Sequence, residues 1–446
     1  MAGGTFKTKN KTLPGAYFRF EAVKKPKGTI GSRGIATMPL ALSWGAQGEV
    51  IELLSTDLVD GKSLAKVGFT VADIEKSKLT RLCLENCYKL LIYRIDKGGK
   101  KATATIGSLT VSAKHAGVFG NSIKIAVIAS DTKKEVVTFV NELEKDRQVV
   151  TSVSELKSND FVDFTGEGAL SPNAGTALTG GTDGTVATAN YTDYFNDLKT
   201  KEWQVMGVPS EDKKLPPILT SYIDGLRNVS GKYVQGVVYD YNKADNIGII
   251  SVKQGFKREL ETVSPVEFTA YITGASAGAD VNESNCFKVI TGATDIVSEF
   301  TEDEIEEEQE KGSLMLMKRV DQKIVICDDV NTLRSYTDEI DEDFSDNFVV
   351  RLFDEIATST RLIFEQSKVG KTANTVTGRE TLKAQLIANF EALQNMAGDP
   401  AIQNFDVNDI KVEKGDGMGD VIVTAYIQPA GKMKKLYATL YKGKAV

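Results

Sequence analysis

Between residues 190 and 330 the sequence alternates helix-like and strand-like hydrophobic patterns, and this alternation restricts the possible folds more than any other feature. Residues 191–200 and 218–230 carry apolar side chains at helical spacing, whereas residues 204–208 and 233–239 are short apolar runs typical of buried strands. Further strand-like runs occur at residues 248–252, 269–273 and 324–327. Strands that alternate with helices in this way favour a mostly parallel sheet with helices on its faces.

A segment rich in strand patterns precedes this region. Its strand-like runs lie at residues 102–111, 122–128, 135–140 and 161–164. Gly-rich breaks at residues 97–101 and 178–184 bound the segment. We therefore expect an α/β fold in which residues 25–97 and 183–330 form one core, with residues 98–182 as an inserted β-rich domain.

The C-terminal region combines two long helical patterns with strands. Residues 344–366 and 379–394 place apolar side chains along one helix face. Residues 420–428 and 434–442 read as strands, and the second run alternates between two faces. Residues 331–433 are therefore expected to form a C-terminal α+β domain.

The two ends of the chain are basic, although the whole protein has a net charge of −7. Residues 1–33 contain eight Lys or Arg and one acidic residue, and residues 432–446 contain five Lys and no acidic residue. Residues 34–431 carry 41 basic and 60 acidic side chains, a net charge of −19. This pattern favours terminal arms, at residues 1–24 and 434–446, that dock on neighbouring copies. The lysines that would assist this docking are Lys7, Lys9, Lys11, Lys434, Lys435 and Lys442.

Nucleic-acid binding by the basic ends is an alternative. The thirteen cations are dispersed, and they come with no groove or aromatic ladder, so the signal for nucleic acid is weak. Solvated ends without a partner are the third interpretation. We expect no nucleic-acid partner.

Composition argues against most catalytic and metal-dependent classes. His115 is the single histidine, and histidine serves most acid–base and zinc chemistry near neutral pH. The four cysteines are too few and too scattered for a disulfide framework, and nothing completes a metal site around Cys83 and Cys87. Apolar runs stay short of the roughly 18 residues that span a bilayer. We expect a soluble protein made without Sec export, with no cofactor, no metal and no membrane insertion.

Short motifs resemble catalytic or ligand-binding patterns but lack parts that such sites need. Gly274–Gly278 fits the nucleophile-elbow string around Ser276, yet no histidine follows it to act as the base. Val369–Thr372 ends like a phosphate-binding loop, but Glu365 stands where the first glycine belongs. Both are expected to be structural turns, and Gly415–Gly419 a hairpin turn. A weak or inactive serine hydrolase using Ser276 remains the alternative function.

Acidic residues gather at 301–310 and at 341–346. The second cluster lacks the glycine of a calcium-binding EF-hand loop, because Asp346 occupies that place. The first cluster, with seven carboxylates, is typical of a solvated helix face or a mobile loop. Its alternative role is a docking surface for the basic ends of a neighbour.

An ordered set of motifs resembles the tail sheath proteins of contractile phages and phage-tail-like bacteriocins, especially those of Gram-positive hosts. The N-terminal motifs resemble the family's P-G-x-Y strand and W-G turn, at Leu13–Tyr17, Arg33–Ala36 and Leu42–Gly45. The central motifs are Ala116–Asn121, Leu178–Gly184, Arg227–Val238 and Gly274–Gly278. The C-terminal motifs are Asp329–Leu333, Val369–Asn374, Gly378–Arg379, Ile427–Pro429 and Lys435–Tyr437. The set covers nearly the whole chain.

The resemblance implies a subtilisin-like α/β core without a catalytic triad, a β-rich insertion and extended terminal arms. It implies a structural subunit, not an enzyme, that polymerises as stacked hexameric rings around a tail tube. Contraction of this sheath would drive the tube through the target cell envelope. The implied partners are further copies of the chain, the tube protein, the baseplate and the tail terminator, in a particle assembled in the cytoplasm of a bacterial host.

The resemblance also implies that the arms add strands to the sheets of neighbouring subunits. An alternating strand without a local partner leaves backbone groups unpaired, and pairing on another chain's sheet edge satisfies them. The residues expected in these inter-subunit strands are Ala16, Tyr17, Phe18, Arg19, Phe20 and Ala22 at one end and Leu436, Tyr437, Ala438, Thr439, Leu440 and Tyr441 at the other.

Overall fold

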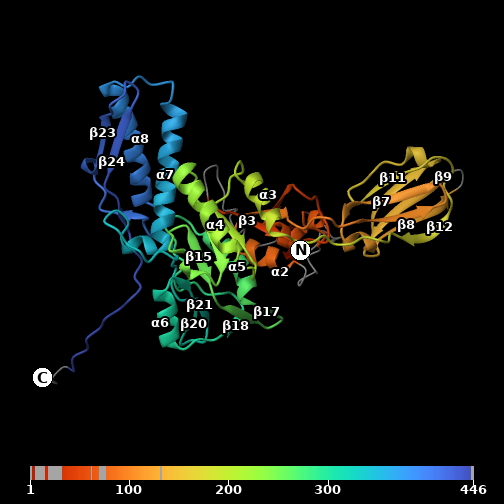
Figure 1. The fold of residues 1–446 in the computed structure, drawn as a ribbon, viewed down its shortest axis with the longest axis horizontal. Coiled ribbons are helices and arrows are strands. Elements are labelled where there is room, and N and C mark those ends of the chain that lie inside the picture. Colours follow the sequence, from red (N-terminus) through yellow and green to blue (C-terminus); the bar gives the residue numbers. More distant parts are fainter. Residues whose placement is uncertain are drawn as a thin grey trace.

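The computed structural model describes residues 33–61, 63–69, 77–130 and 133–442, together with the backbone of two short N-terminal strands, β1 (Gly3–Thr5) and β2 (Ala16–Phe18). A central α/β body carries a β-sandwich on one side and a helical C-terminal domain on the other (Figure 1). The mixed α/β class with several sheets, expected from the sequence, is confirmed.

The central body is built on a seven-stranded sheet with the order β19-β15-β14-β13-β3-β5-β4. All neighbouring strands run parallel except β4, which is antiparallel to β5. The strands are β3 (Ile35–Leu40), β4 (Val50–Leu54), β5 (Lys89–Arg94), β13 (Val205–Val208), β14 (Gln235–Tyr239), β15 (Ile249–Val252) and β19 (Ser313–Leu314). The predicted parallel sheet is therefore present.

Helices cover both faces of this sheet. On one face pack α2 (Lys78–Leu84) and α5 (Pro265–Gly278), and on the other pack α3 (Thr188–Leu198) and α4 (Leu215–Asp224). The period of two along β5 separates the faces, since Leu90 and Ile92 join the first core while Leu91 and Tyr93 join the second. All four side chains are nearly inaccessible to solvent, which explains why β5 reads as a continuous apolar run.

Helix α5 corrects two expectations from the sequence. Residues 269–273 were expected to form a strand and Gly274–Gly278 a turn, but both lie within this one helix. The helix begins with a capping box between Ser264 and Glu267, followed by Pro265 at its first position. Because every residue from 268 to 278 is buried, the helix has no exposed polar face and its sequence shows no helical period.

The glycines of this helix serve close packing. A Cβ at Gly274 would lie 2.1 Å from the carbonyl oxygen of Cys83, and a Cβ at Gly278 would lie 1.8 Å from that of Asn86. The end of α2 therefore packs directly against the backbone of α5. Ser276, the hydrolase candidate, is fully buried in the same helix, so the nucleophile-elbow interpretation is wrong.

The inserted segment is a β-sandwich whose two antiparallel sheets have the orders β10-β9-β8-β12 and β11-β7-β6 and share one core. Its strands are β6 (Lys101–Ile106), β7 (Leu109–Ala116), β8 (Ile123–Ser130), β9 (Lys133–Val140), β10 (Leu143–Val150), β11 (Val162–Thr165) and β12 (Asn173–Ala177). Trp44 of the central body reaches into this core. The buried Arg94 side chain also joins the two parts, since it donates hydrogen bonds to the carbonyls of Gly45 and Ala116.

The C-terminal domain contains α7 (Asn347–Ser367) and α8 (Val376–Gln394), which confirm the two predicted long helices. An antiparallel hairpin of β23 (Ile410–Lys414) and β24 (Val421–Ala425) packs beside α8, and β22 (Ile402–Gln403) pairs with β25 (Gln428–Pro429). Residues 369–372 form the turn between α7 and α8, and residues 415–419 form the turn of the hairpin. Both turn predictions are confirmed.

Smaller elements close the lower side of the central body. A three-stranded sheet joins β16 (Gly255–Arg258), β17 (Glu261–Val263) and β18 (Ala293–Val297), and β20 (Leu316–Lys318) pairs with β21 (Ile324–Ile326). The acidic run forms α6 (Glu302–Glu310), capped by Thr301. Most of its carboxylates are exposed, whereas Glu308 is bonded to Lys253 and Ser313, so the predicted solvated helix face is present. A single turn, α1 (Asp57–Asp60), follows β4.

Candidate assembly interface

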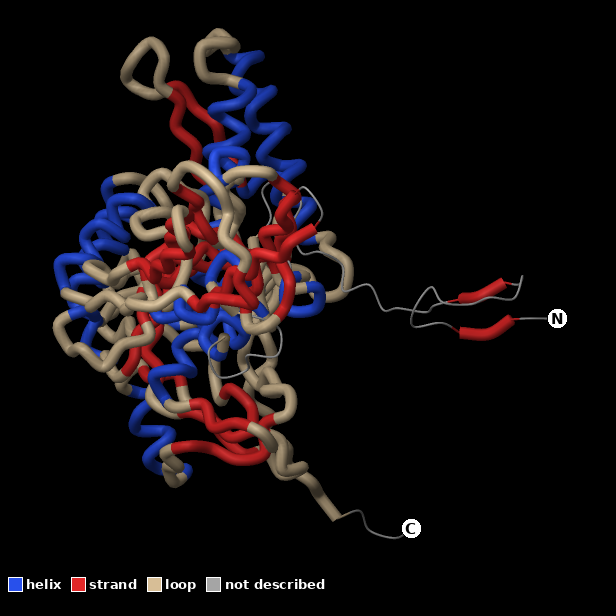
Figure 2. Tube along the Cα trace, turned by 90° about the vertical axis from the view of Figure 1, so that its right-hand side faces the viewer, coloured by secondary structure: helices blue, strands red, loops and turns tan. Residues whose placement is uncertain are grey.

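Residues 435–442 form an extended segment that runs away from the body (Figures 1 and 2). They belong to no strand of the described chain. Leu436, Tyr437, Leu440 and Tyr441 are each about nine-tenths exposed, at 91%, 89%, 92% and 89%. Contiguous large apolar side chains left in water mark a surface that another molecule covers. The alternating side chains predicted from the sequence thus lie on an arm that extends away from the body.

The arm is attached to the body by Lys434. Its Nζ lies 2.6 Å from Oδ1 of Asp328 and 2.8 Å from Oδ2 of Asp346. The Lys434 side chain is 26% exposed, in contrast to the fully exposed side chains that follow it. Two residues earlier, Lys432 pairs with Asp399 at 3.3 Å and lies over the ring of Phe348. The expected docking lysine Lys434 is therefore engaged within its own chain, while Lys435 and Lys442 are exposed.

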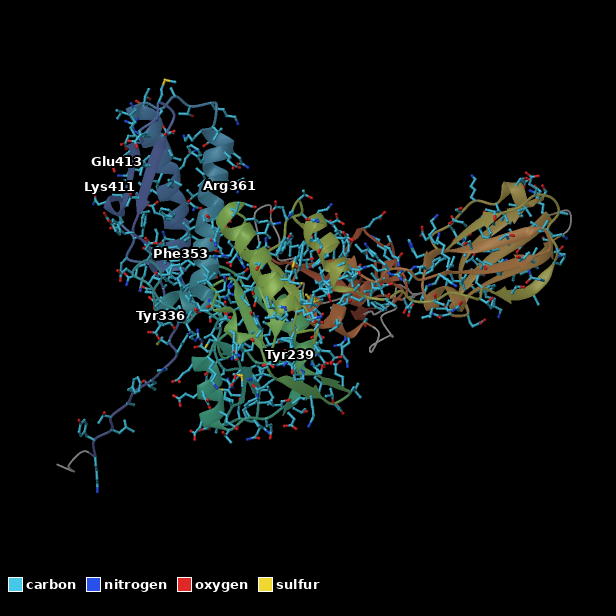
Figure 3. The ribbon with its side chains drawn as sticks, viewed as in Figure 1. Tyr239, Tyr336, Phe353, Arg361, Lys411 and Glu413 are labelled. Carbon is cyan, nitrogen blue, oxygen red and sulfur yellow. The ribbon has the colours of Figure 1, made fainter. Side chains whose placement is uncertain are left out.

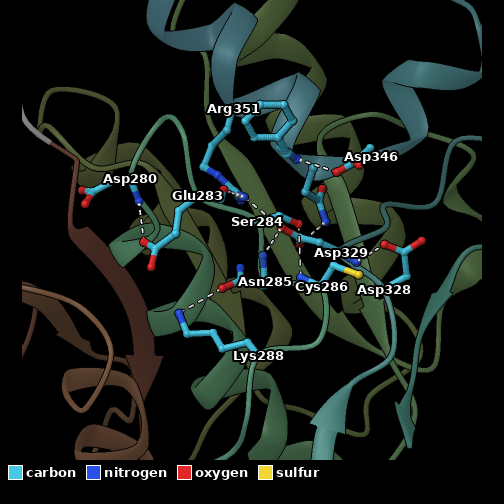
Figure 4. A network of polar contacts seen from close by, with 12 residues as sticks. Asp280, Glu283, Ser284, Asn285, Cys286, Lys288, Asp328, Asp329, Asp346 and Arg351 are labelled. Carbon is cyan, nitrogen blue, oxygen red and sulfur yellow. Dashed lines mark hydrogen bonds and ion pairs between the residues drawn. The ribbon is translucent and has the colours of Figure 1, made fainter. Parts of the chain in front are cut away.

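The acidic partners of Lys434 are held in place by the start of α7 (Figure 4). Asp346 is the N-cap of this helix, and its Oδ1 accepts a hydrogen bond from the Phe348 amide at 2.8 Å. Asp328 precedes Asp329, whose Oδ2 accepts bonds from the Arg351 guanidinium and the Asn285 amide at 2.8 and 2.9 Å. Lys434, Asp328 and Asp346 thus form a clamp that connects the arm to α7 and to the loop that follows β21.

The charges around this clamp perturb its titratable groups. Burial raises the pKa of Asp346 above its ordinary value, although the Lys434 charge opposes that shift. Burial would also raise the pKa of Asp329, but the Arg351 charge and the hydrogen bonds outweigh it and hold that pKa below the ordinary value. Burial alone would lower the pKa of Lys434, yet Asp346 and Asp328 raise it. Lys434 therefore carries its positive charge at neutral pH.

A second buried ion pair ties α7 to the central body. The Arg227 guanidinium donates to both carboxylate oxygens of Asp354, at 2.8 and 2.7 Å, and both side chains are 7% exposed. A bidentate pair of this kind fixes orientation as well as distance. This pair and the pair of Asp329 and Arg351 hold the first turns of α7 on the α/β core. The first turns of α7 therefore form a rigid mount that connects the arm to the core.

An apolar groove lies in the part of the C-terminal domain that contains α7, α8 and β24. It has a volume of about 580 Å³, and Tyr233 of the central body contributes to its lining beside the side chains of these three elements. Its lining residues include Phe353, Ile356, Leu382, Leu386, Val421 and Val423. Figure 3 shows Phe353 and Arg361 on α7, with Lys411 and Glu413 across on β23. Among the described strands β24 pairs only with β23, so its other edge carries unpaired backbone groups beside the groove.

Only part of the predicted N-terminal arm strand lies in the described chain. Ala16, Tyr17 and Phe18 form β2, which pairs in parallel with β1. The other predicted residues of this arm, Arg19, Phe20, Ala22, Lys7, Lys9 and Lys11, lie outside the described residues. Their expected role stays a prediction.

No sequence pattern links Lys434 with Asp328 and Asp346, because only the fold brings them together. The local signal available is Asp346, an aspartate directly before a helical pattern, which is typical of an N-cap. The groove is equally hidden in the sequence, since its apolar lining reads as ordinary helix and strand core.

The described part of the chain holds no cluster of His, Cys, Asp or Glu that could bind a metal ion. None of its helices is long and apolar enough to cross a membrane. Cys83 and Cys87 lie with their sulfur atoms 3.9 Å apart in the core between α2 and α5, with their thiols buried.

The sequence matches three domains described for one protein family. Residues 97–183 match the phage tail sheath protein beta-sandwich domain, residues 184–332 match the phage tail sheath protein central domain, and residues 339–442 match the phage tail sheath C-terminal domain. These matches cover the sandwich, most of the core and the α7–α8 region in turn.

Relatives of known structure and sequence agree with this assignment. The sheath tail protein of Desulfitobacterium hafniense is 32% identical, with a TM-score of 0.81 over 95% of this chain and 99% of its own. Protein XkdK of the phage-like element PBSX of Bacillus subtilis is 29% identical over 98% of this chain and 99% of its own. The sheath of an extracellular contractile injection system in its contracted state shares the fold, with a TM-score of 0.56 and 10% identity over 98% of this chain and 99% of that chain.

Proposed function

Since the chain belongs to the phage tail sheath protein family, we propose that it is the polymerising subunit of a contractile tail sheath. Copies form hexameric rings that stack around a tail tube, and contraction of the stack drives the tube through the target cell envelope. The tube protein, the baseplate and the tail terminator are its further partners. Assembly takes place in the cytoplasm of the bacterial host, and the product is a phage tail or a bacteriocin particle.

The observation that carries this proposal is the free C-terminal arm, together with the unpaired edge of β24. The arm offers alternating apolar side chains and unpaired backbone groups, and the edge of β24 offers the complementary backbone groups next to an apolar groove. Strand addition on the β24 edge of a second copy satisfies both. In this arrangement Leu436, Ala438 and Leu440 enter the groove, while Tyr437, Thr439 and Tyr441 face outward.

Each part of the chain has its own role in the proposed sheath. Residues 25–97 and 183–330 are the core, for which the parallel sheet covered by helices supports a subtilisin-like origin. Residues 98–182 decorate the outer surface, and residues 331–433 receive the arms of neighbours. Residues 1–24 and 434–446 are the linking arms, and their lysines other than Lys434 approach neighbouring bodies of net negative charge.

The test is electron microscopy of the purified chain, alone and with the tube protein of its particle. Hollow striated cylinders are expected from the full chain. A variant ending at Lys434 keeps the clamp and lacks residues 435–446, so it is expected to stay a folded monomer. Normal cylinders from this truncated variant would refute the arm assignment, and dispersed monomers from the full chain with tube protein would refute the sheath function.

A further inference from the structure

The clamp at Lys434 sets the direction in which the C-terminal arm leaves the body. Ala430 is the last residue before the arm whose amide is bonded to the body, to the carbonyl of Ala401 at 3.0 Å. Beyond it, in the part of the arm that the structure describes, the ion pairs with the body are those of Lys432 and Lys434. The chain turns outward at this point, away from the β23–β24 hairpin, which lies at the opposite end of the domain (Figures 1 and 2).

The arm is long enough to reach the hairpin of its own chain. Lys434 sits at the N-cap of α7, whereas Asn374, beyond the other end of α7, is bonded to the carbonyls of Met418 and Asp420 beside the hairpin turn. The hairpin therefore lies alongside α7, whose 21 residues span about 31 Å. The twelve residues after Lys434 span about 40 Å when extended. Distance alone therefore does not prevent the arm from closing on its own β24 edge.

Such closure would compete strongly with assembly. A short tether gives the arm an effective concentration in the mM range at its own hairpin. A neighbouring copy in solution is far more dilute than that. An arm that could swing freely would cover its own groove and leave the subunit unable to link to others.

We propose that Lys434, held between Asp328 and Asp346, is a device that keeps the arm off its own hairpin and so makes strand addition intermolecular. This inference rests on the proposed function of the arm. The two carboxylates approach Lys434 from different elements, the loop after β21 and the start of α7, so they fix the direction of the side chain as well as its position. Both elements are anchored by the fully buried pair of Asp329 and Arg351.

The chain offers a matched control for this role. Lys435 is the next residue, carries the same charge and is exposed, with no ion pair among the described residues. Lys434→Ala and Lys435→Ala therefore remove equal charge from the arm, but only the first releases the clamp. Lys434→Arg keeps a cation at the clamp and serves as the conservative variant.

The experiment measures chymotrypsin cleavage of the arm in the monomer, at Tyr437, Leu440 and Tyr441, together with the protein concentration at which sheath forms. We expect Lys434→Ala to be cleaved several-fold more slowly and to need several-fold more protein to polymerise. Lys435→Ala and Lys434→Arg should behave like the parent chain. Adding Val423→Lys to Lys434→Ala should restore rapid cleavage, because a charge in the groove removes the site on which the arm closes.

Cleavage of Lys434→Ala at the parental rate would overturn the inference, whether or not polymerisation changes, because the released arm would then be as free as the clamped one. The truncated variant that ends at Lys434 tests the proposed function separately. If that truncation polymerises normally, the arm is not the linker, and the cleavage result still decides whether the clamp restrains it.

Discussion

The ring of Trp44 lies edge-on to the ring of His115, with their centroids 5.0 Å apart and their planes at 82°. Trp44 comes from the central body and His115 from β7 of the sandwich, so this contact joins two domains. Phe119 and Phe161 of the sandwich complete the aromatic contacts of Trp44, with centroids at 5.0 and 6.4 Å. The junction is therefore an aromatic cluster around the buried Trp44, and it contains the chain's single histidine.

Acidification should weaken this junction through His115. Burial lowers the pKa of His115 below its ordinary value of 6.5, and the charges of Arg94, Lys101 and Lys114 lower it further, against the opposing charge of Asp163. The unfolded chain then binds the proton more readily than the folded chain, so stability falls as pH decreases from 6.5 to the folded pKa and levels off below it.

The measurement is urea unfolding between pH 7.5 and pH 5, for the parent and for His115→Gln. Carboxylates titrate in both proteins, so the difference between the two curves isolates the histidine. We expect the variant to lose less stability than the parent over this range. Parallel curves would contradict the prediction, and the single imidazole signal in an NMR titration gives its pKa directly.

Truncating Trp44 should loosen the sandwich from the body. Trp44 is 1% exposed and packs in the sandwich core, so Trp44→Ala should cost about 3–5 kcal/mol of unfolding free energy. Val320, which is 98% exposed, provides the control, and Val320→Ala should stay within about 0.5 kcal/mol of the parent. Denaturant unfolding measures both changes. Equal stabilities of the two variants would show that Trp44 does not hold the junction.

Gly278 should not tolerate a methyl group. Its Cβ would lie 1.8 Å from the carbonyl oxygen of Asn86, so Gly278→Ala should separate α2 from α5 and cost about 1–3 kcal/mol. Gly225, at the end of α4, has a negative φ and no atom within 4 Å of the position that a Cβ would occupy, so Gly225→Ala should be neutral or stabilising by up to about 1 kcal/mol. Thermal unfolding of both variants decides the matter, and an unchanged melting temperature for Gly278→Ala would contradict the packing argument.

Sequence patterns predicted the parallel sheet and the long helices because those elements have one distinct period. Residues 204–208 and 233–239 read as buried strands since both faces of the central sheet are covered, and α7 shows a clear apolar stripe. Residues 269–278 were misread because a helix buried on every side has no period, and small residues suit a turn as well as a close helix contact. The ion pairs of Lys434 could not be predicted from the sequence, because Asp346 and Asp328 are 88 and 106 residues away in the chain.

The buried pair of Asp329 and Arg351 should be the most sensitive point of the arm's mount. Both side chains are fully buried, so Arg351→Met leaves the Asp329 charge without its partner and should cost about 3–5 kcal/mol. Arg361→Met removes an exposed helical pair with Glu365 and should cost less than about 0.5 kcal/mol. Chemical unfolding measures both values. Similar small losses for the two variants would mean that the buried pair adds nothing to the mount.

The face of the C-terminal arm that enters the neighbour's groove can be tested by two adjacent substitutions. Leu440 and Tyr441 are 92% and 89% exposed in the monomer, so a lysine at either position should leave the monomer's melting temperature unchanged. If Leu440 enters the apolar groove and Tyr441 faces outward, Leu440→Lys buries a charge without a partner and should abolish sheath formation, whereas Tyr441→Lys should only weaken it. Sedimentation and electron microscopy measure the polymer. The opposite order of effects would place the tyrosine face in the groove, and normal assembly of both variants would remove the arm from the interface altogether.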